Sequence, residues 1–325
     1  MLDSASKILF HLIAQSGTLK KLASRYGLRR PSSFARRFIA GETVEEAIAA
    51  ARALEARGML ISLDLLGESV TSLAAASAAT RGYLEVIDAI IASGIERNIS
   101  LKLTQLGLDV DRACTVDNLR KILETAGPAG FFVRIDMENS PYTEVTLDIF
   151  ETLWGHGYTQ LGVVLQSMLY RSEQDLARIN RLGARIRLVK GAYKEPPDKA
   201  YPKKADTDAN YDLLTKILID CNLQMEDNRL SSDGRVPPIP AIATHDEKRI
   251  AFAKQYSEKV GLPKEAIEFQ MLYGIRRDLQ EQLVKEGYPV RVYVPFGTHW
   301  YPYFMRRLAE RPANIWFFIS NFFRK

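Results

Sequence analysis

Two basic side chains, Arg187 and Lys190, mark the end of an apolar run. Ile186 and Leu188 alternate with Arg187, so a β-strand here would direct its apolar side chains to one face and the guanidinium group to the other. Gly191 follows, and a glycine lets the backbone come close to a ligand. Two cations beside an open backbone suit an anionic group such as a phosphate, or an electron-rich ring. A strand whose cations pair with neighbouring carboxylates gives the same pattern.

A second basic pair lies near the C-terminus, in a stretch that we predict to be helical over residues 299–310. Tyr303 precedes Arg306 by three residues and Arg307 by four, so at 3.6 residues per turn the phenol shares a face with both arginines. The forked guanidinium donors fit a carboxylate. The alternative is a basic helix face that pairs with Glu310 and with solvent.

These side chains need a scaffold that brings distant segments together, and the rest of the sequence predicts one. Apolar, often β-branched runs alternate with helical stretches along the chain. The predicted strands are residues 60–66, 99–104, 131–137, 161–166, 186–189, 239–244, 267–272 and 290–296. Eight such units are typical of a closed parallel barrel. We therefore predict an α/β protein with a (β/α)8 TIM-type barrel.

Polar side chains stand at or just after the ends of the predicted strands, where the loops of such a barrel converge on one mouth. In chain order they are Glu68, Lys102, Asp136, Gln166, Arg187, Lys190, Thr244, His245, Gln270 and Tyr293. Taken singly, each is as easily a helix cap or a solvated loop residue. Because the whole set falls where a barrel gathers its loops, we predict a functional site there.

The segment before the first strand, residues 1–57, is predicted to be a helical N-terminal extension, whose last helix starts at Thr43. Residues 58–325 would then form the barrel. The widest interval between strands, residues 194–236, is interpreted as an insertion with a helix from about Asp208.

The composition is that of a globular protein, since 46% of the 325 residues are hydrophobic and 26% are charged. The net charge is +5 and the basic residues are interspersed with acidic ones, which does not favour a nucleic-acid partner. Cys114 and Cys221 lie far apart without a nearby histidine, which argues against a disulfide framework or a metal site. No stretch is typical of a secretion signal or a membrane span, so we expect a cytoplasmic protein.

Several stretches share their residues and their order with one known family. They are Asp64-Leu65-Leu66-Gly67-Glu68, Ser100-Leu101-Lys102-Leu103-Thr104, Arg134-Ile135-Asp136-Met137-Glu138, Arg187-Leu188-Val189-Lys190-Gly191-Ala192-Tyr193, Ala243-Thr244-His245-Asp246, Phe269-Gln270-Met271-Leu272, Arg291-Val292-Tyr293 and residues 303–314. On these motifs the chain resembles the flavin-dependent proline dehydrogenase family, specifically its shorter, monofunctional bacterial members. The resemblance runs from about residue 40 to residue 314.

This resemblance implies an FAD-binding barrel that oxidises L-proline to 1-pyrroline-5-carboxylate by hydride transfer to flavin N5, the first step of proline catabolism to glutamate. It also implies that the electrons pass to a quinone. Because the chain ends at Lys325, we expect neither the aldehyde-oxidising domain nor the DNA-binding segment of the fused bifunctional relatives. The product would pass to a separate 1-pyrroline-5-carboxylate dehydrogenase.

The resemblance also implies roles for the motif residues. The expected catalytic residues are Asp136 and Arg187, and the arginine is expected beside flavin N5, where a cation stabilises the reduced ring. The residues expected to hold the substrate carboxylate or to wall the proline ring are Lys102, Tyr193, Leu272, Tyr293, Tyr303, Arg306 and Arg307. The expected FAD contacts are Met137, Gln166, Arg187, Lys190, Gly191, Ala192, Thr244, His245 and Gln270.

Two further features follow from the resemblance. Glu68 is expected to pair with Arg306 and to gate the mouth of the barrel. Tyr293 stands where hydroxyproline-preferring relatives have serine, which implies a preference for proline over 4-hydroxyproline.

Two rival interpretations remain open from the residues themselves. Lys102 or Lys190 could serve as a Schiff-base nucleophile, as in aldolase-type barrels, if its pKa were depressed. Alternatively, the basic mouth could bind an anion or a nucleic acid without turning it over, although clustered exposed aromatics typical of single-strand binding are not evident among the basic residues.

The C-terminal tail, residues 316–325, combines aromatic and basic residues. Such a segment can lie on a bilayer surface, which predicts peripheral contact with the inner face of the membrane. The alternative is that it packs against the barrel.

Overall fold

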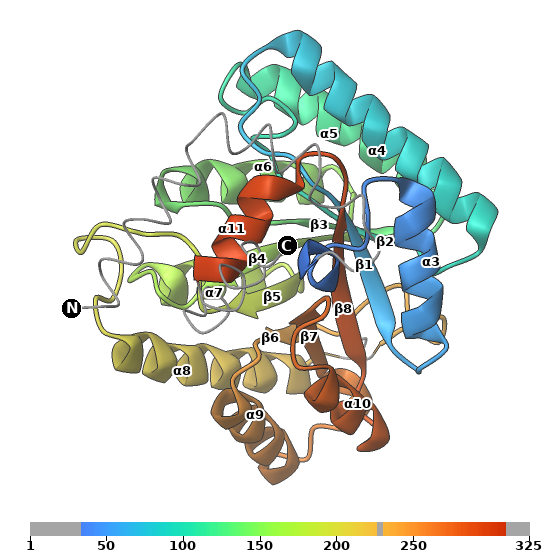
Figure 1. Ribbon diagram of the computed structural model, residues 1–325. Helices are drawn as coiled ribbons and strands as arrows, with labels where there is room; N and C mark the ends of the chain where they lie inside the picture. The colour runs from blue at the N-terminus through green and yellow to red at the C-terminus, as the bar shows by residue number, and fades with distance from the viewer. Residues whose placement is uncertain (1–33, 226–229, 310–325) are drawn as a thin grey trace, which may run out of the picture.

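Eight parallel strands close into a barrel that is surrounded by helices (Figure 1). The structure is a computed structural model and describes residues 34–225 and 230–309. Each strand pairs with the next in the chain, and the last pairs with the first. The strands are β1 (Leu60–Leu65), β2 (Asn98–Leu101), β3 (Phe132–Ile135), β4 (Leu161–Gln166), β5 (Arg185–Val189), β6 (Pro240–Ala243), β7 (Glu268–Leu272) and β8 (Val290–Phe296). The predicted (β/α)8 barrel is thus confirmed.

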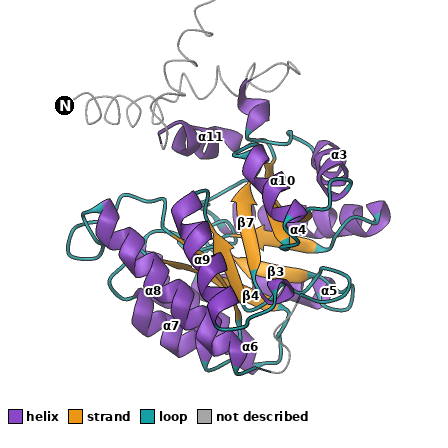
Figure 2. Ribbon diagram, turned by 90° about the horizontal axis from the view of Figure 1, so that it is seen from below, coloured by secondary structure: helices purple, strands orange, loops and turns teal. Residues whose placement is uncertain are grey.

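The outer layer consists of helices that follow the strands and cover the barrel wall (Figure 2). They are α4 (Leu73–Ser93), α5 (Arg112–Ala126), α6 (Thr143–Gly155), α7 (Ser172–Asn180), α8 (Lys204–Leu223), α9 (Glu247–Lys259) and α10 (Arg277–Lys285). Short 3-10 helices, η2 (Ser140–Tyr142) and η3 (Lys264–Ala266), precede α6 and β7. The core between this layer and the barrel is apolar, as the β/α pattern requires.

Most predicted bounds lie within two residues of the observed ones, and two differ by more. The run 99–104 ends as a strand at Leu101, because residues 103–107 fold into turns in which Leu106 N–H donates to Leu103 C=O. The helix predicted from about Asp208 begins at Lys204, and its N-cap residue Lys203 makes no side-chain capping bond that the sequence could have revealed.

The segment before β1 contains the 3-10 helix η1 (Phe34–Arg37) and helix α3 (Val44–Glu55). Helix α3 starts with a capping box in which the Thr43 hydroxyl accepts from Glu46 N–H and the Glu46 carboxylate accepts from Thr43 N–H. It packs on β1 and β8. The start predicted at Thr43 is correct, whereas residues 1–33 of the predicted extension lie outside the described part of the chain.

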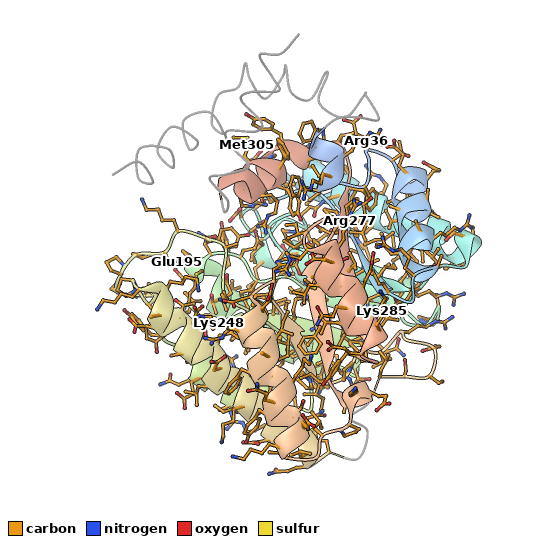
Figure 3. All side chains as sticks on the ribbon, turned by 60° about the horizontal axis from the view of Figure 1, so that its bottom comes forward. Arg36, Glu195, Lys248, Arg277, Lys285 and Met305 are labelled. Atoms are coloured by element: carbon orange, nitrogen blue, oxygen red, sulfur yellow. The ribbon has the colours of Figure 1, made fainter. Side chains whose placement is uncertain are left out.

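The last described helix, α11 (Trp300–Ala309), crosses the mouth of the barrel and is held there by the segment around η1. Phe38 and Ile39 are buried in one apolar cluster with Trp300 and Phe304. Figure 3 shows Arg36 of η1 and Met305 of α11 side by side on this face. The backbone fixes the segment further, because Ala40 N–H donates to Pro295 C=O at the end of β8. The residues of α11 therefore have a defined position above the strand ends.

Candidate active site

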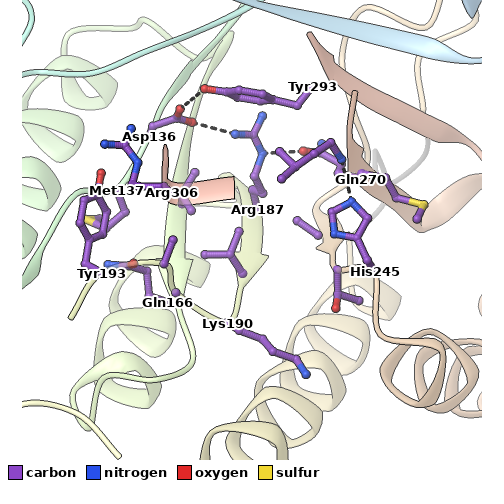
Figure 4. A pocket seen from close by; sticks show the side chains of 18 of the residues that line it. Asp136, Met137, Gln166, Arg187, Lys190, Tyr193, His245, Gln270, Tyr293 and Arg306 are labelled. Carbon is purple, nitrogen blue, oxygen red and sulfur yellow. Dashed lines mark hydrogen bonds and ion pairs between the residues drawn. The ribbon is translucent and has the colours of Figure 1, made fainter. Parts of the chain in front are cut away.

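The C-terminal ends of the strands and helix α11 enclose a pocket of about 510 Å³ (Figure 4). Seventeen of the side chains or backbone positions singled out in the sequence line it. They are Lys102, Asp136, Met137, Gln166, Arg187, Lys190, Gly191, Ala192, Tyr193, Thr244, His245, Gln270, Leu272, Tyr293, Tyr303, Arg306 and Arg307. The remaining one, Glu68, is not part of the lining but contacts it through Arg306. The fold thus gathers these positions into one site.

Arg187 occupies the centre of the site and is almost fully buried. Its Nη1 donates to Asp136 Oδ1 at 2.7 Å, its Nε to Gln270 Oε1 at 2.5 Å, and its Nη2 to Ser100 Oγ at 3.0 Å. The guanidinium carbon also lies 5.3 Å from the centre of the Tyr293 ring. With all three of its nitrogens in hydrogen bonds, the guanidinium is fixed in one orientation.

A second buried cation, Lys102, lies between two carboxylates. Its Nζ is 3.4 Å from Asp64 and 3.4 Å from Asp136 Oδ2, and Tyr293 donates its hydroxyl hydrogen to Asp136 Oδ2 at 2.7 Å. Burial opposes the charge on Lys102, but the two carboxylates outweigh it and hold the lysine pKa well above its usual value. Burial, with Asp136 adding to it, raises the pKa of Tyr293 well above its usual value, so this phenol stays a donor at neutral pH.

This environment weighs against the Schiff-base interpretation for Lys102. A nucleophilic lysine needs a depressed pKa, so that its amine is neutral near pH 7. The carboxylates of Asp64 and Asp136 have the opposite effect on Lys102. Lys190, the other candidate, is held in ion pairs with Asp208 at 2.5 Å and Asp246 at 2.6 Å.

Helix α11 supplies the basic side of the mouth. Arg306 Nη1 donates to Glu68 Oε1 at 2.7 Å, which links the helix to the loop after β1. Burial disfavours the charge of Arg306, but Glu68 more than compensates and raises the arginine pKa. The guanidinium carbon of Arg307 lies 5.2 Å from the centre of the Tyr303 ring. Both arginines line the same pocket as Lys102, so three cations lie around one volume.

At the opposite end of the pocket the backbone is shaped by Gly191. Its φ of +117° is strained for other residues, and an added Cβ would lie 2.3 Å from the Met168 sulfur. His245 Nε2 accepts a hydrogen bond from Leu272 N–H at 2.9 Å, so this imidazole nitrogen carries no proton. Gln166 Nε2 donates to Glu138 C=O at 2.8 Å. These bonds hold the exits of β4, β6 and β7 at fixed positions around the pocket.

Asp64 and Ser100 belong to the site although the sequence reasoning assigned them no role. Both are fully buried, on β1 and β2, and they contact Lys102 and Arg187 respectively. The signal for Ser100 was its spacing, since it stands two residues before Lys102 and therefore faces the same side of β2. For Asp64 the signal was a carboxylate inside an otherwise apolar strand, which is rarely buried unless it is paired.

The fold and the site together define an α/β-barrel enzyme whose mouth combines a cationic cluster with a buried arginine–carboxylate pair. Comparison with known proteins makes this specific. The proline dehydrogenase family profile matches residues 47–318. The chain is 40% identical to proline dehydrogenase 2 of Bacillus subtilis (strain 168) over 317 residues, covering 97% of this chain and 98% of the relative. It is also 40% identical to the proline dehydrogenase of Deinococcus radiodurans over 325 residues, covering 99% of each.

The solved structures agree with the sequence relatives. Proline utilization A from Bdellovibrio bacteriovorus, inactivated by N-propargylglycine, superposes with a TM-score of 0.76 at 28% identity. The match covers 85% of this chain and 32% of that longer one. The chain belongs to the proline dehydrogenase family. It is therefore an oxidoreductase of proline catabolism, of the short type to which the Bacillus and Deinococcus relatives belong.

Within residues 34–225 and 230–309, no helix is long and apolar enough to cross a membrane.

Proposed function

We propose that the pocket binds FAD together with L-proline and that the enzyme forms 1-pyrroline-5-carboxylate by hydride transfer to flavin N5. The observation that carries this proposal is the fixed Arg187, bonded to Asp136 and Gln270 beneath the arginines of α11. A flavin ring needs a largely apolar floor with hydrogen-bonding groups at its edge. Val164, Val189 and Ala243 supply such a floor in the pocket lining.

The expected FAD contacts are all among the residues that line the pocket. They are Met137, Gln166, Arg187, Lys190, Gly191, Ala192, Thr244, His245 and Gln270. Bound there, FAD supplies the hydride acceptor. The charge of Arg187 would stabilise the negative charge that hydride transfer places on the flavin ring, and Asp136 holds that arginine in place.

The other lining residues would orient the substrate. Arg306, Arg307 and Lys102 would bind the carboxylate of proline, because forked guanidinium donors and an ammonium group suit this anion. The side chains that would enclose the ring are Tyr193, Leu272, Tyr293 and Tyr303. Glu68 would act as a gate, since its ion pair with Arg306 joins α11 to the loop after β1 and would have to break for the mouth to open.

The proposal is tested with purified protein and L-proline. We expect a yellow protein with the absorbance of oxidised flavin at about 450 nm. Proline should bleach this absorbance under anaerobic conditions. A dye or quinone acceptor should restore it, and 2-aminobenzaldehyde should trap the product. A colourless protein that stays inactive after FAD is added would refute the cofactor assignment.

The resemblance also supports partners beyond the pocket. We propose that a quinone accepts the electrons in the cell and that a separate 1-pyrroline-5-carboxylate dehydrogenase takes the product. We also propose that the enzyme is cytoplasmic and works at the inner face of the membrane. Its N-terminal extension would comprise residues 1–57 and its barrel residues 58–325. The predicted membrane contact, residues 316–325, lies outside the described part of the chain. Removing residues 315–325 should abolish co-sedimentation with anionic vesicles while sparing dye-linked activity; loss of both would favour packing against the barrel.

A further inference from the structure

A buried carboxylate, Glu268, lies directly beneath the site without lining it. It is the first residue of β7, and its side chain is fully buried inside the barrel. Gln270 Nε2 donates to Glu268 Oε1 at 2.5 Å. On the other side, Arg291 Nε donates to Oε1 at 2.9 Å and Arg291 Nη2 donates to Oε2 at 3.0 Å. Glu268 thus connects a pocket residue with a buried cation deeper in the barrel.

Arg291 stabilises this carboxylate inside the protein through two hydrogen bonds. An unpaired carboxylate would be strongly disfavoured there, but a forked pair with an arginine compensates its lost hydration. Arg291 is itself satisfied, since it also donates to the carbonyls of Ile61 and Gly234 and pairs with Glu96. Both oxygens of Glu268 therefore accept hydrogen bonds, and Oε1 is the acceptor that faces Gln270.

This acceptor dictates which way the Gln270 amide faces. The amide has one accepting end and one donating end, and its donating end must turn to Glu268. The accepting oxygen is then directed at Arg187, whose Nε–H can only donate. A flipped amide would set two donors against each other at Arg187 and two acceptors against each other at Glu268. Glu268 thus fixes the orientation of the Gln270 amide that holds Arg187.

We propose that Glu268 is a positioning residue for the oxidation of proline: through the Gln270 amide it fixes the guanidinium of Arg187. This inference rests on the role proposed above for Arg187 at the flavin. Without the carboxylate, the amide is free to turn and Arg187 loses the acceptor on Nε. The substrate carboxylate is held by other cations, so the effect belongs to the hydride-transfer step and not to proline binding.

The chain offers a matched control for the test. Glu268→Gln and Glu96→Gln each remove one carboxylate from the same arginine, Arg291, but only Glu268 contacts Gln270. Both variants are purified as holoenzymes, and flavin reduction is followed by stopped flow over a range of proline concentrations. The flavin midpoint potential and the FAD dissociation constant are measured alongside.

For Glu268→Gln we expect the limiting rate of flavin reduction to fall about 10- to 100-fold, since misplacement of a catalytic group by ~1 Å has effects of this order. The midpoint potential should shift to a more negative value, because the cation beside the flavin is less well fixed, and the dissociation constant for proline should be unchanged. Glu96→Gln should leave all three values unchanged. Equal slowing in both variants, or no slowing in either, would overturn the proposal.

Two further measurements keep the inference separate from the proposed function and from folding defects. In a crystal structure of Glu268→Gln without ligands, we expect Arg187 Nε to lie more than about 3.5 Å from Gln270 Oε1; an unchanged contact overturns the positioning role whatever the cofactor. If the single variant does not fold, the double variant Glu268→Gln/Gln270→Glu exchanges amide and carboxylate and keeps an acceptor facing Arg187. It should fold and keep the Arg187 contact in its crystal structure, and loss of that contact would count against the proposal.

Discussion

At the scale of single residues, the charges of the site nearly cancel below the mouth. Lys102 and Arg187 are balanced by Asp64 and Asp136, all within one hydrogen-bonded group. In the proposed binding mode, Lys102 would therefore orient the substrate carboxylate, and the two arginines of α11, of which Arg306 is partly offset by Glu68, would supply most of its attraction.

Replacement of Arg187 by Met tests the catalytic assignment. In the proposed mechanism, Arg187 stabilises the negative charge that develops on the flavin ring during hydride transfer. Arg187→Met should therefore lower the rate of flavin reduction by about 10²-fold while changing the dissociation constant for proline much less. Stopped-flow reduction at several proline concentrations separates the two. Weaker binding with an unchanged reduction rate would contradict the role.

Replacement of Tyr293 by Ser tests substrate choice. The Tyr293 hydroxyl donates to Asp136, so the phenol is fixed at one edge of the pocket, where it should disfavour an added hydroxyl. We expect kcat/KM for proline to exceed that for 4-hydroxyproline by about 10- to 200-fold, and Tyr293→Ser to reduce this ratio, chiefly by weakening proline. An unchanged ratio would disprove the assignment.

Arg306→Ala is the companion measurement to Tyr293→Ser. Both substrates present the same carboxylate, so this variant should impair both about equally, at a cost of about 2 to 5 kcal/mol in transition-state stabilisation. If it discriminates between the substrates more strongly than the tyrosine variant does, the division between carboxylate binding and ring recognition is wrong.

Much of the site was predictable at this scale because strand alternation and strand ends are visible in the sequence. Arg187, Lys102 and Asp136 were identified in this way. Glu268 was not, although its two-residue spacing from Gln270 on β7 was visible, because its pairing with Arg291 depends on how β7 and β8 align. A single sequence shows which side chains share a face of one strand, but it does not show the register between strands.

At the scale of elements, the position of α11 depends on a segment from the other end of the chain. The rings of Phe38 and Phe304 have their centres 6.2 Å apart, and Phe38 is buried against the helix that carries the arginines. The same cluster includes Leu66, and Ile275 and Tyr293 pack against it. The exact placement of α11 over the strand ends should therefore respond to changes around η1.

Phe38→Ala should both destabilise the fold and weaken proline binding. Loss of a buried phenylalanine costs about 3 to 5 kcal/mol of folding free energy, and the cavity lets α11 shift. Thr43→Ala is the control, since it removes the cap of α3 at a cost of about 0.5 to 2 kcal/mol without touching α11. Thermal unfolding and proline titration should show both variants less stable but only Phe38→Ala with raised KM. If Phe38→Ala and Thr43→Ala had the same KM for proline, α11 would be positioned independently of Phe38.

Element types were easier to predict than element ends. The run 131–137 contains only four residues of strand, Phe132–Ile135, and its members Phe131 and Met137 are buried although they lie in the loops on either side. Burial makes loop and strand residues at a barrel mouth alike in composition. By contrast, the start of α3 at Thr43 was predictable, since a capping box is a local pattern.

At the scale of the whole molecule, the N-terminal end of the barrel is closed by a buried ion network that should shape its pH stability. Burial raises the pKa of Glu96 to about 7 from 4.5, against the opposing effect of Arg291. The folded protein thus keeps a proton that the unfolded chain loses above pH 4.5. The contribution of Glu96 to stability is complete below that pH and is lost as the pH rises through 7.

Glu96→Gln should remove this pH dependence. The two pKa values differ by enough to change the free energy of unfolding by about 3 kcal/mol, so the stability of the wild type relative to the variant should fall between pH 5 and pH 8. Thermal unfolding of both proteins across this range measures the difference. Parallel curves would mean that Glu96 is ionised throughout.

The pairing of β1 with β8 also determines when the enzyme can become active during synthesis. β1 aligns with β8 over six residue pairs, from Leu60 with Arg291 to Leu65 with Phe296. Until the ribosome has released β8, β1 presents an unpaired edge, the kind of edge that invites aggregation. The arginines of α11 emerge later still. The sheet of the nascent chain therefore remains open and inactive during most of translation. Chaperone protection of the first strand would matter most in that interval.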